Sequence, residues 1–220
     1  FVFSMFLLAI KVKNKKIIVI SLLVVLFTGF QAWLGAKVVD SNLAPLKITT
    51  HMAMAFVILL MIVYILYALK NLNSKIVVKQ DNLLKKAALA LFVFTFFQMI
   101  VGTQVRQDID RISHQLSNQP RQTWIDELGV LFMGHKNMAL ILTLGTFWLL
   151  HKMKKAGFDV KFPFNALLGI TITEFCVGLG LNFLGLPWFL QPIHLVLAGM
   201  ILSIQFYLFM LLNRKTTRSV

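Results

Sequence analysis

The chain has 220 residues, of which 58% are hydrophobic, and its mean hydropathy is +0.79. So much apolar material excludes a soluble globular domain of this size. The net charge of +14 would suit a nucleic-acid partner, but the basic residues lie in short segments that flank long apolar stretches, which is typical of membrane proteins. We therefore expect an all-α polytopic protein whose solvent is the lipid bilayer, and no nucleic-acid partner.

The apolar stretches predict the membrane spans, because a spanning helix needs about 20 mostly apolar residues. In chain order we expect one partial span and six full ones, at 1–10, 17–36, 48–69, 84–105, 130–150, 163–185 and 191–212. The chain opens inside an apolar run that has no charged region before it. We therefore expect that the sequence starts within a helix of a longer protein and that its first bundle is truncated.

The connecting segments alternate in charge. One set, which includes the C-terminal end, carries sixteen Lys and Arg residues against two Asp residues, whereas the other set carries five basic and five acidic residues. Positively charged connections remain in the cytoplasm. The sequence therefore predicts a cytoplasmic C-terminus, with the segment around 106–128 as the long polar connection on the outer side.

Two short patterns recur in the same order. Helices that enter from the outer side begin with His-x-x-x-Ala, and the helices before them carry Gln-x-x-x-Gly or Glu-x-x-x-Gly. The three paired occurrences are Gln31 to Gly35 with His51 to Ala55, Gln98 to Gly102 with His135 to Ala139, and Glu174 to Gly178 with His194 to Ala198. Such regular recurrence predicts a repeated helix hairpin.

The repeat also predicts the domain organisation, because two hairpins make a four-helix bundle. Residues 84–212 hold two hairpins and are expected to form a complete C-terminal bundle. Residues 1–70 hold one hairpin and the end of another, and are expected to belong to a similar, truncated N-terminal bundle. We assign 71–83 to a cytoplasmic linker and 213–220 to a basic cytoplasmic tail.

The three repeated histidines are the candidate functional residues. An ionisable group inside a span is costly and usually marks function, although a single histidine could simply bond a neighbouring helix. Three at equivalent positions favour a shared ligand role. Zinc or copper would want further ligands, whereas two facing imidazoles suffice for heme iron. We predict that His135 and His194 are axial heme ligands in the complete bundle.

Two charged residues accompany the histidines. Arg106 continues the stripe of Gln98 and Gly102 at the outer boundary, where it could pair with a heme propionate or simply extend towards the membrane surface. Glu174 occupies the position of glutamine in the other repeats, which favours a structural hydrogen-bonding role over proton transfer. The small residues Gly102 and Gly178 would leave room for a flat macrocycle.

These residues resemble the heme A synthase family (the Cox15 and CtaA proteins). The resemblance covers nearly the whole chain. It rests on the segments Gln31-Ala-Trp-Leu-Gly35, Asn42-Leu-Ala-Pro45 with His51, Gln98-Met-Ile-Val-Gly102-Thr-Gln-Val-Arg106 and Gln191-Pro-Ile-His194.

The resemblance implies eight helices in two pseudosymmetric four-helix bundles. It implies that His135 and His194 hold heme b in the second bundle, and that His51 is one of two histidines that receive the substrate, heme O, in the first. The family oxidises a methyl group of heme O to a formyl group, which gives heme A for cytochrome oxidase. The other first-bundle histidine and the catalytic carboxylate are expected upstream of residue 1, so no catalytic residue is assigned.

Two other functions remain open. A bis-histidine membrane cytochrome b would carry electrons without modifying heme, and a transporter would need the helix breaks that these spans lack. We expect a bacterial plasma membrane location rather than a mitochondrial one. Heme O synthase and cytochrome oxidase assembly factors are the expected protein partners, and a homo-oligomer is left open.

Overall fold

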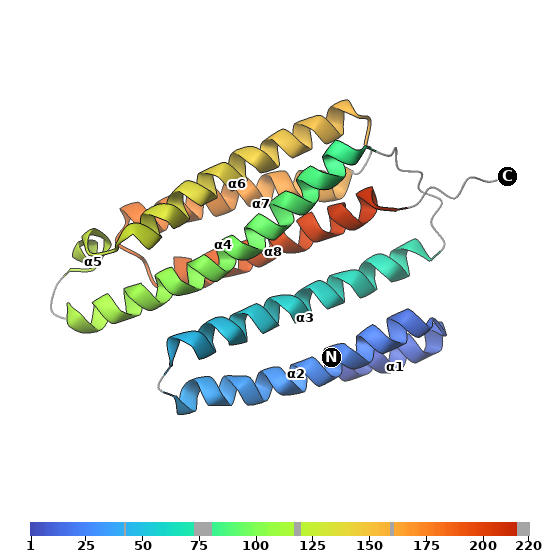
Figure 1. The fold of residues 1–220 in the computed structure, drawn as a ribbon, viewed down its shortest axis with the longest axis horizontal. Coiled ribbons are helices and arrows are strands. Elements are labelled where there is room, and N and C mark those ends of the chain that lie inside the picture. The colour runs from blue at the N-terminus through green and yellow to red at the C-terminus, as the bar shows by residue number, and fades with distance from the viewer. Residues whose placement is uncertain (42, 73–80, 117–119, 159–160, 215–220) are drawn as a thin grey trace. The chain divides into compact units, whose positions relative to one another are not determined.

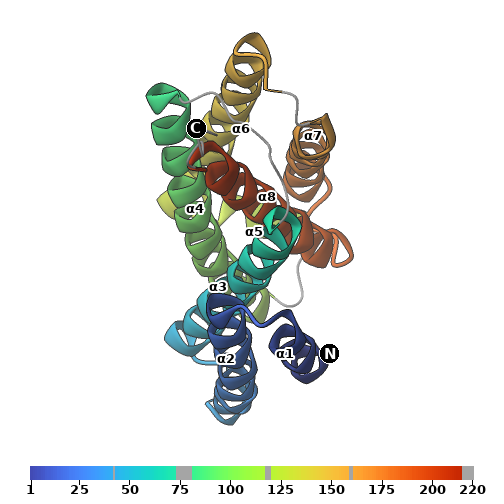
Figure 2. The ribbon, with the colours of Figure 1, turned by 90° about the vertical axis from the view of Figure 1, so that its right-hand side faces the viewer.

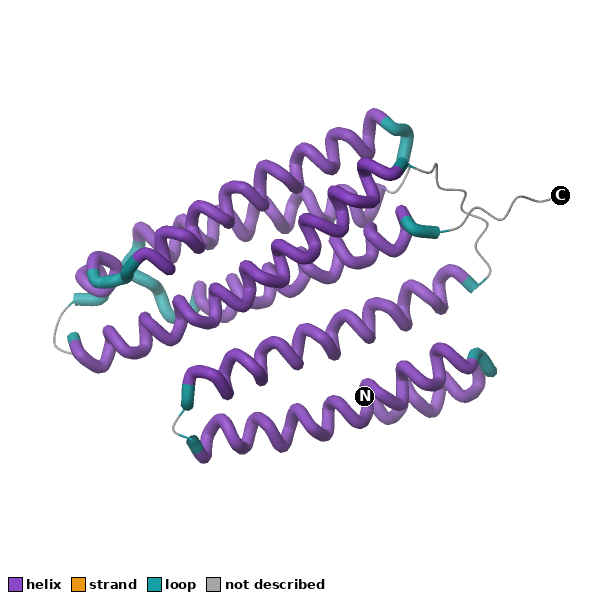
Figure 3. The backbone as a smooth tube through the Cα atoms, in the orientation of Figure 1, coloured by secondary structure: helices purple, strands orange, loops and turns teal. Residues whose placement is uncertain are grey.

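The computed structural model describes residues 1–41, 43–72, 81–116, 120–158 and 161–214, and these residues contain helices and short connections but no strand (Figures 1 and 3). Six helices are long and apolar enough to cross a membrane, and the shorter apolar helix Val2–Val12 precedes them. The prediction of an all-α polytopic membrane protein is therefore confirmed. The chain divides into two compact units, Phe1–Ile76 and Val77–Val220, which are described separately.

The N-terminal unit consists of three helices, α1 (Val2–Val12), α2 (Lys15–Asp40) and α3 (Pro45–Asn71). Helix α2 begins where the Asn14 side chain accepts hydrogen bonds from the backbone N–H groups of Lys16 and Ile17. Helix α2 packs against both α1 and α3. Small and branched apolar residues fill the contact between the three helices, namely Ala9, Ile17, Val24 and Ile65.

The C-terminal unit is a four-helix bundle with a short additional helix. Each long helix packs against two others, in the cyclic order α4, α6, α7, α8, which can be followed by the labels in Figure 2. The helices are α4 (Asn82–Gln115), α5 (Gln122–Asp126), α6 (Val130–Lys155), α7 (Lys161–Phe183) and α8 (Leu190–Leu212). Gly145 lets α6 approach α4 closely, because a Cβ atom there would come within 2.8 Å of the Leu91 side chain.

Helix α4 is longer than the predicted span, which ended at residue 105. The extension to Gln115 was not predicted, because its charged residues lower the mean hydropathy of this segment. Val105, Ile109 and Ile112 nevertheless form a buried apolar stripe on it. Val105 and Ile109 pack with Leu186 from the α7–α8 connection, and residues from the short helix α5, which was not predicted, cover this cluster. The polar connection therefore forms a packed cap over the bundle.

The predicted linker 71–83 and tail 213–220 lie largely outside the described residues, which exclude 73–80 and 215–220. The turn between α7 and α8 is described fully. Gly185 and Leu186 both adopt positive φ values there, 71° and 56°. The Leu186 carbonyl accepts hydrogen bonds from Gln191 Nε2 at 3.1 Å and from Arg121 Nη1 at 3.4 Å. These two hydrogen bonds therefore fix the turn that precedes α8, the helix that carries His194.

Candidate functional site

The α2–α3 hairpin brings its two repeated patterns into direct contact. Gln31 Nε2 donates a hydrogen bond to the backbone carbonyl of His51 at 2.9 Å and lies 3.3 Å from the ring Nε2 of the same histidine. One turn along α2, Gly35 faces the ring edge, where a Cβ atom would lie 3.0 Å from His51 Cε1. Gln31 therefore holds the backbone of α3 while Gly35 makes room for the imidazole.

The α4–α6 hairpin repeats this arrangement with different residues. Gln98 Nε2 donates to the backbone carbonyl of His135 at 2.8 Å, and the Gln98 side chain is buried. A Cβ atom on Gly102 would lie 3.2 Å from His135 Cε1. Gly102 was expected to leave space for a flat macrocycle, but its free face is directed at the histidine ring.

The α7–α8 hairpin departs from the other two. Glu174 stands where they have glutamine, and its Oε1 lies 3.0 Å from the ring Nδ1 of His194 rather than at the backbone carbonyl. The two atoms are close, but the orientation of the ring does not allow a hydrogen bond between them. Gly178 again faces the ring, but less closely, with a Cβ position 3.7 Å from His194 Cε1. The carboxyl group thus contacts the imidazole itself.

His135 and His194 face each other inside the C-terminal bundle. Their ring centroids lie 6.4 Å apart and their ring planes are inclined at 76°. A metal–imidazole bond is about 2.0 Å long, so two imidazoles that bind one ion from opposite sides have ring centres roughly 6 Å apart. The two side chains therefore have the separation that a shared metal centre needs.

The ring nitrogens are available for such a role. Nδ1 of His135 is buried and has no hydrogen-bond partner, and no hydrogen bond is formed by Nε2 of His135 or of His194 among the described residues. No three of the described His, Cys, Asp and Glu side chains gather into a metal cluster. The two histidines therefore suit a group that brings its own equatorial ligands better than they suit a bare ion.

His51 lies in the N-terminal unit and is the single histidine of residues 1–76. Its Nδ1 is buried without a hydrogen-bond partner. His51 thus shares the local surroundings of His135, a glutamine at its carbonyl and a glycine at its ring edge. Within its own unit, however, it has no second imidazole to face.

Arg106 lies one turn beyond Gly102 on α4 and forms an ion pair with Asp110, with Nη1 2.6 Å from Oδ1. About half of each side chain is exposed, 51% for Arg106 and 43% for Asp110, so this i, i+4 pair is weak. Lys136, next to His135, bonds Asn182 Oδ1 on α7 at 3.3 Å. Arg106 is therefore accessible, but an anion would have to compete with Asp110 for it.

Sequence reasoning missed two sets of buried polar residues. A threonine precedes each repeated Gln or Glu by three residues, at Thr28, Thr95 and Thr171, and the last two are buried without a hydrogen-bond partner. The constant offset from the repeat was the signal that could have found them. Gln205, on α8, is 3% exposed, and both atoms of its amide lack a partner in the described part of the chain.

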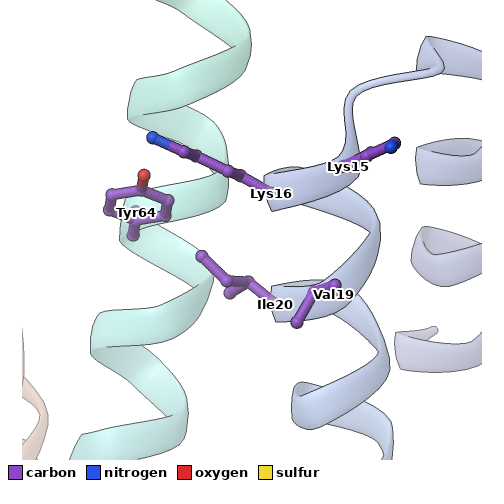
Figure 4. Close-up of a pocket in the computed structure, with 5 residues that line it drawn as sticks. All are labelled: Lys15, Lys16, Val19, Ile20 and Tyr64. Atoms are coloured by element: carbon purple, nitrogen blue, oxygen red, sulfur yellow. The ribbon is translucent and has the colours of Figure 1, made fainter.

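The N-terminal unit also has a shallow pocket of about 290 Å³, shown in Figure 4. Lys15, Lys16, Val19 and Ile20 from α2 and Tyr64 from α3 line it, and the Lys16 side chain extends towards Tyr64. Ile20 and Gln31 are eleven residues apart on α2, which is about three helical turns. The pocket is therefore separate from the histidine site.

Comparison with known protein families gives one match. The family COX15-CtaA, described as cytochrome oxidase assembly protein, matches residues 1–206. No curated protein and no solved structure matches the chain. The family match covers all three hairpins and therefore includes every repeated histidine.

Proposed function

The chain belongs to the COX15-CtaA family of cytochrome oxidase assembly proteins, and on this basis we propose that it is a heme A synthase that oxidises the methyl group of heme O to a formyl group. The observation that carries the proposal is the facing pair His135 and His194, with ring centroids 6.4 Å apart inside a membrane-embedded four-helix bundle. Four-helix bundles commonly bind cofactors between side chains of facing helices.

The residues present fit a heme b in this bundle. The two imidazoles have a spacing that suits two ligands of one iron, while Gly102 and Gly178 face the ring edges without a side chain. Gln98 holds the backbone at His135. Arg106, half exposed near the same end of the helices, supplies a cation for a propionate.

A bound heme b would supply one-electron chemistry. The residues of this chain would hold and orient it. His135 and His194 would hold it, and the apolar surfaces of α4, α6, α7 and α8 would exclude water and so lower the local dielectric constant. In the N-terminal unit, His51 is proposed to bind the substrate, heme O, because its surroundings match those of His135.

The membrane orientation is part of the proposal. The lysine-rich ends of the helices would face the cytoplasm and the histidine ends the outer side, as positively charged connections require. The chain would then be an integral protein of the bacterial plasma membrane that receives heme O from its synthase and passes heme A to cytochrome oxidase assembly.

A second candidate function is a bis-histidine cytochrome b that carries electrons. The observation in its favour is that the facing pair of imidazoles lies within the C-terminal unit, so that a single heme there would suffice for electron transfer. Both functions require the same heme site in the C-terminal bundle. They differ in whether a second porphyrin binds at His51 and is altered.

The deciding experiment has two parts. The chain is purified from cells that make heme O, its visible spectrum is recorded, and the extracted porphyrins are separated by chromatography. The proposal predicts a low-spin heme b spectrum together with a second bound porphyrin, heme O or heme A. Heme b without a second porphyrin would favour the cytochrome.

Single replacements assign the sites. His135→Ala and His194→Ala should each remove the low-spin heme b signal, whereas His51→Ala should retain it and lose bound heme O or heme A. Equal loss from all three variants would contradict the division into two sites. Retention of heme b by both His135→Ala and His194→Ala would overturn the proposed cofactor site.

A further inference from the structure

Glu174 breaks the symmetry of the three hairpins. In the other two, a glutamine amide contacts the backbone carbonyl of the histidine, at 2.9 Å for Gln31 and 2.8 Å for Gln98. Glu174 has no amide N–H to donate to a carbonyl, and its Oε1 lies 3.0 Å from the Nδ1 of His194. The substitution of Glu for Gln therefore removes the contact with the backbone carbonyl and leaves a contact with the imidazole ring, which Gln31 makes only in addition to its backbone contact.

A carboxyl group at this position is costly. Glu174 lies inside a membrane-spanning helix, its side chain is 15% exposed, and its Oε2 is buried without a hydrogen-bond partner. Ionisable residues inside spans face the interior of a bundle and usually mark function. A glutamine in the same place, as in the other hairpins, would avoid this cost, so packing alone gives no reason for the carboxyl group.

The chemistry of metal-bound histidine supplies a reason. A histidine that binds a metal through one ring nitrogen commonly donates the N–H of the other to a carboxylate, which orients the ring and makes it a more basic ligand. Glu174 Oε1 is already at hydrogen-bond distance from Nδ1, and reorientation of the two side chains would align them. His135 has no equivalent, because neither a hydrogen bond nor a carboxylate contact reaches its buried Nδ1 among the described residues.

We propose that Glu174 is a positioning residue that orients His194 and strengthens it as an axial ligand, so that the two heme ligands of the C-terminal bundle are unequal. This inference rests on the proposed function, since it requires a heme between His135 and His194. A more basic imidazole stabilises the oxidised iron more than the reduced iron. Glu174 therefore lowers the midpoint potential of the bound heme.

The test is a redox titration and a heme titration of the purified full chain. Glu174→Gln restores the residue type of the other hairpins and nearly preserves volume. It should keep the low-spin spectrum, shift the midpoint potential to a more positive value and raise the heme dissociation constant about 10-fold, as loss of the partner of a ligating histidine does. Glu174→Asp, which keeps a shorter carboxyl group, should fall between Glu174→Gln and the unaltered chain.

Thr171→Val is the matched control. Thr171 is buried one turn before Glu174 on the same helix and its hydroxyl has no hydrogen-bond partner among the described residues, so this variant should leave the midpoint potential unchanged. Unchanged potential and affinity in Glu174→Gln, with heme still lost in His194→Ala, would overturn the inference alone. Equal shifts in Glu174→Gln and Thr171→Val would also overturn it, because they would indicate a general packing effect. Heme binding that survives both His135→Ala and His194→Ala would instead overturn the proposed function.

Discussion

The imidazole of His135 lies against Gly102, where a Cβ atom would stand 3.2 Å from Cε1. The same contact recurs at 3.0 Å for Gly35 with His51 and at 3.7 Å for Gly178 with His194. These three distances form a graded series, since contacts near 3 Å force the neighbour to move and 3.7 Å is ordinary van der Waals contact. The series therefore distinguishes glycines that leave space for an imidazole ring from glycines that only allow two helices to pack closely.

Replacement of these glycines by alanine should therefore have unequal effects on heme binding. Gly102→Ala should displace the His135 ring and weaken heme b binding several-fold, whereas Gly178→Ala should leave it unchanged. Gly178→Ala should also be neutral or up to about 1 kcal/mol more stable, because alanine favours helix. Heme titration of the purified variants measures this, and equal weakening in both would contradict the prediction.

The two buried glutamines of the C-terminal bundle should respond in opposite ways to replacement by leucine. Gln98→Leu removes a hydrogen bond to the His135 carbonyl and should cost about 1 kcal/mol of unfolding free energy. Gln205→Leu removes an amide whose two polar atoms have no partner among the described residues, so it should be neutral or stabilising. Thermal unfolding in detergent compares them. A large loss of stability in Gln205→Leu would mean that its amide is satisfied by water or a bound molecule.

The Arg106–Asp110 pair allows a test of the proposed propionate contact. Arg106→Gln should lower heme affinity, because it removes the cation, whereas Asp110→Asn should maintain or increase affinity, because it frees Arg106 from its competitor. Neither change should alter stability by more than about 0.5 kcal/mol, since the pair is exposed. Heme titration at low and high salt measures both. Unchanged affinity in Arg106→Gln would exclude the contact.

Lys13 ends helix α1 in the left-handed region, with a φ of 56° and its backbone N–H bonded to the Ile10 carbonyl. Glycine adopts this conformation without steric cost, so Lys13→Gly should raise the unfolding free energy by about 1 kcal/mol. Lys11→Gly, two residues earlier and inside the helix, is the control and should lower it by a similar amount. The difference in unfolding temperature between the two variants checks the assignment.

The hairpin geometry could be predicted from the sequence because the informative residues recur. Gln98 and His135 are 37 residues apart, yet the repeat already paired them, and the structure places the Gln98 amide on the His135 carbonyl. Periodic apolar stretches likewise predicted the helices. The direction of the Glu174 contact could not be predicted, because glutamic acid and glutamine occupy the same position in the repeat and the pattern does not show which atom of the partner each one contacts.

The cap of the C-terminal bundle was the main omission in the predicted fold. Its apolar residues, such as Ile109 and Trp124, are separated by charged and amide side chains. The mean hydropathy of this region is therefore low, which predicts a solvent-exposed segment. Their packing against Leu186 depends on a connection more than 60 residues later in the chain. Long-range packing of this kind leaves no local periodic signal.

The contact of Gln31 and Gln98 with histidine carbonyls separates two tasks that many cofactor sites assign to one side chain. The amide fixes the position of one helix against its neighbour, and in the α4–α6 hairpin it does so at the backbone, which leaves the His135 ring to bind a group in the interior of the bundle. A repeated hairpin can thus change the residue that faces the interior while its two helices keep the same alignment. Hairpins that share this helix contact can therefore carry histidines with different roles within one chain.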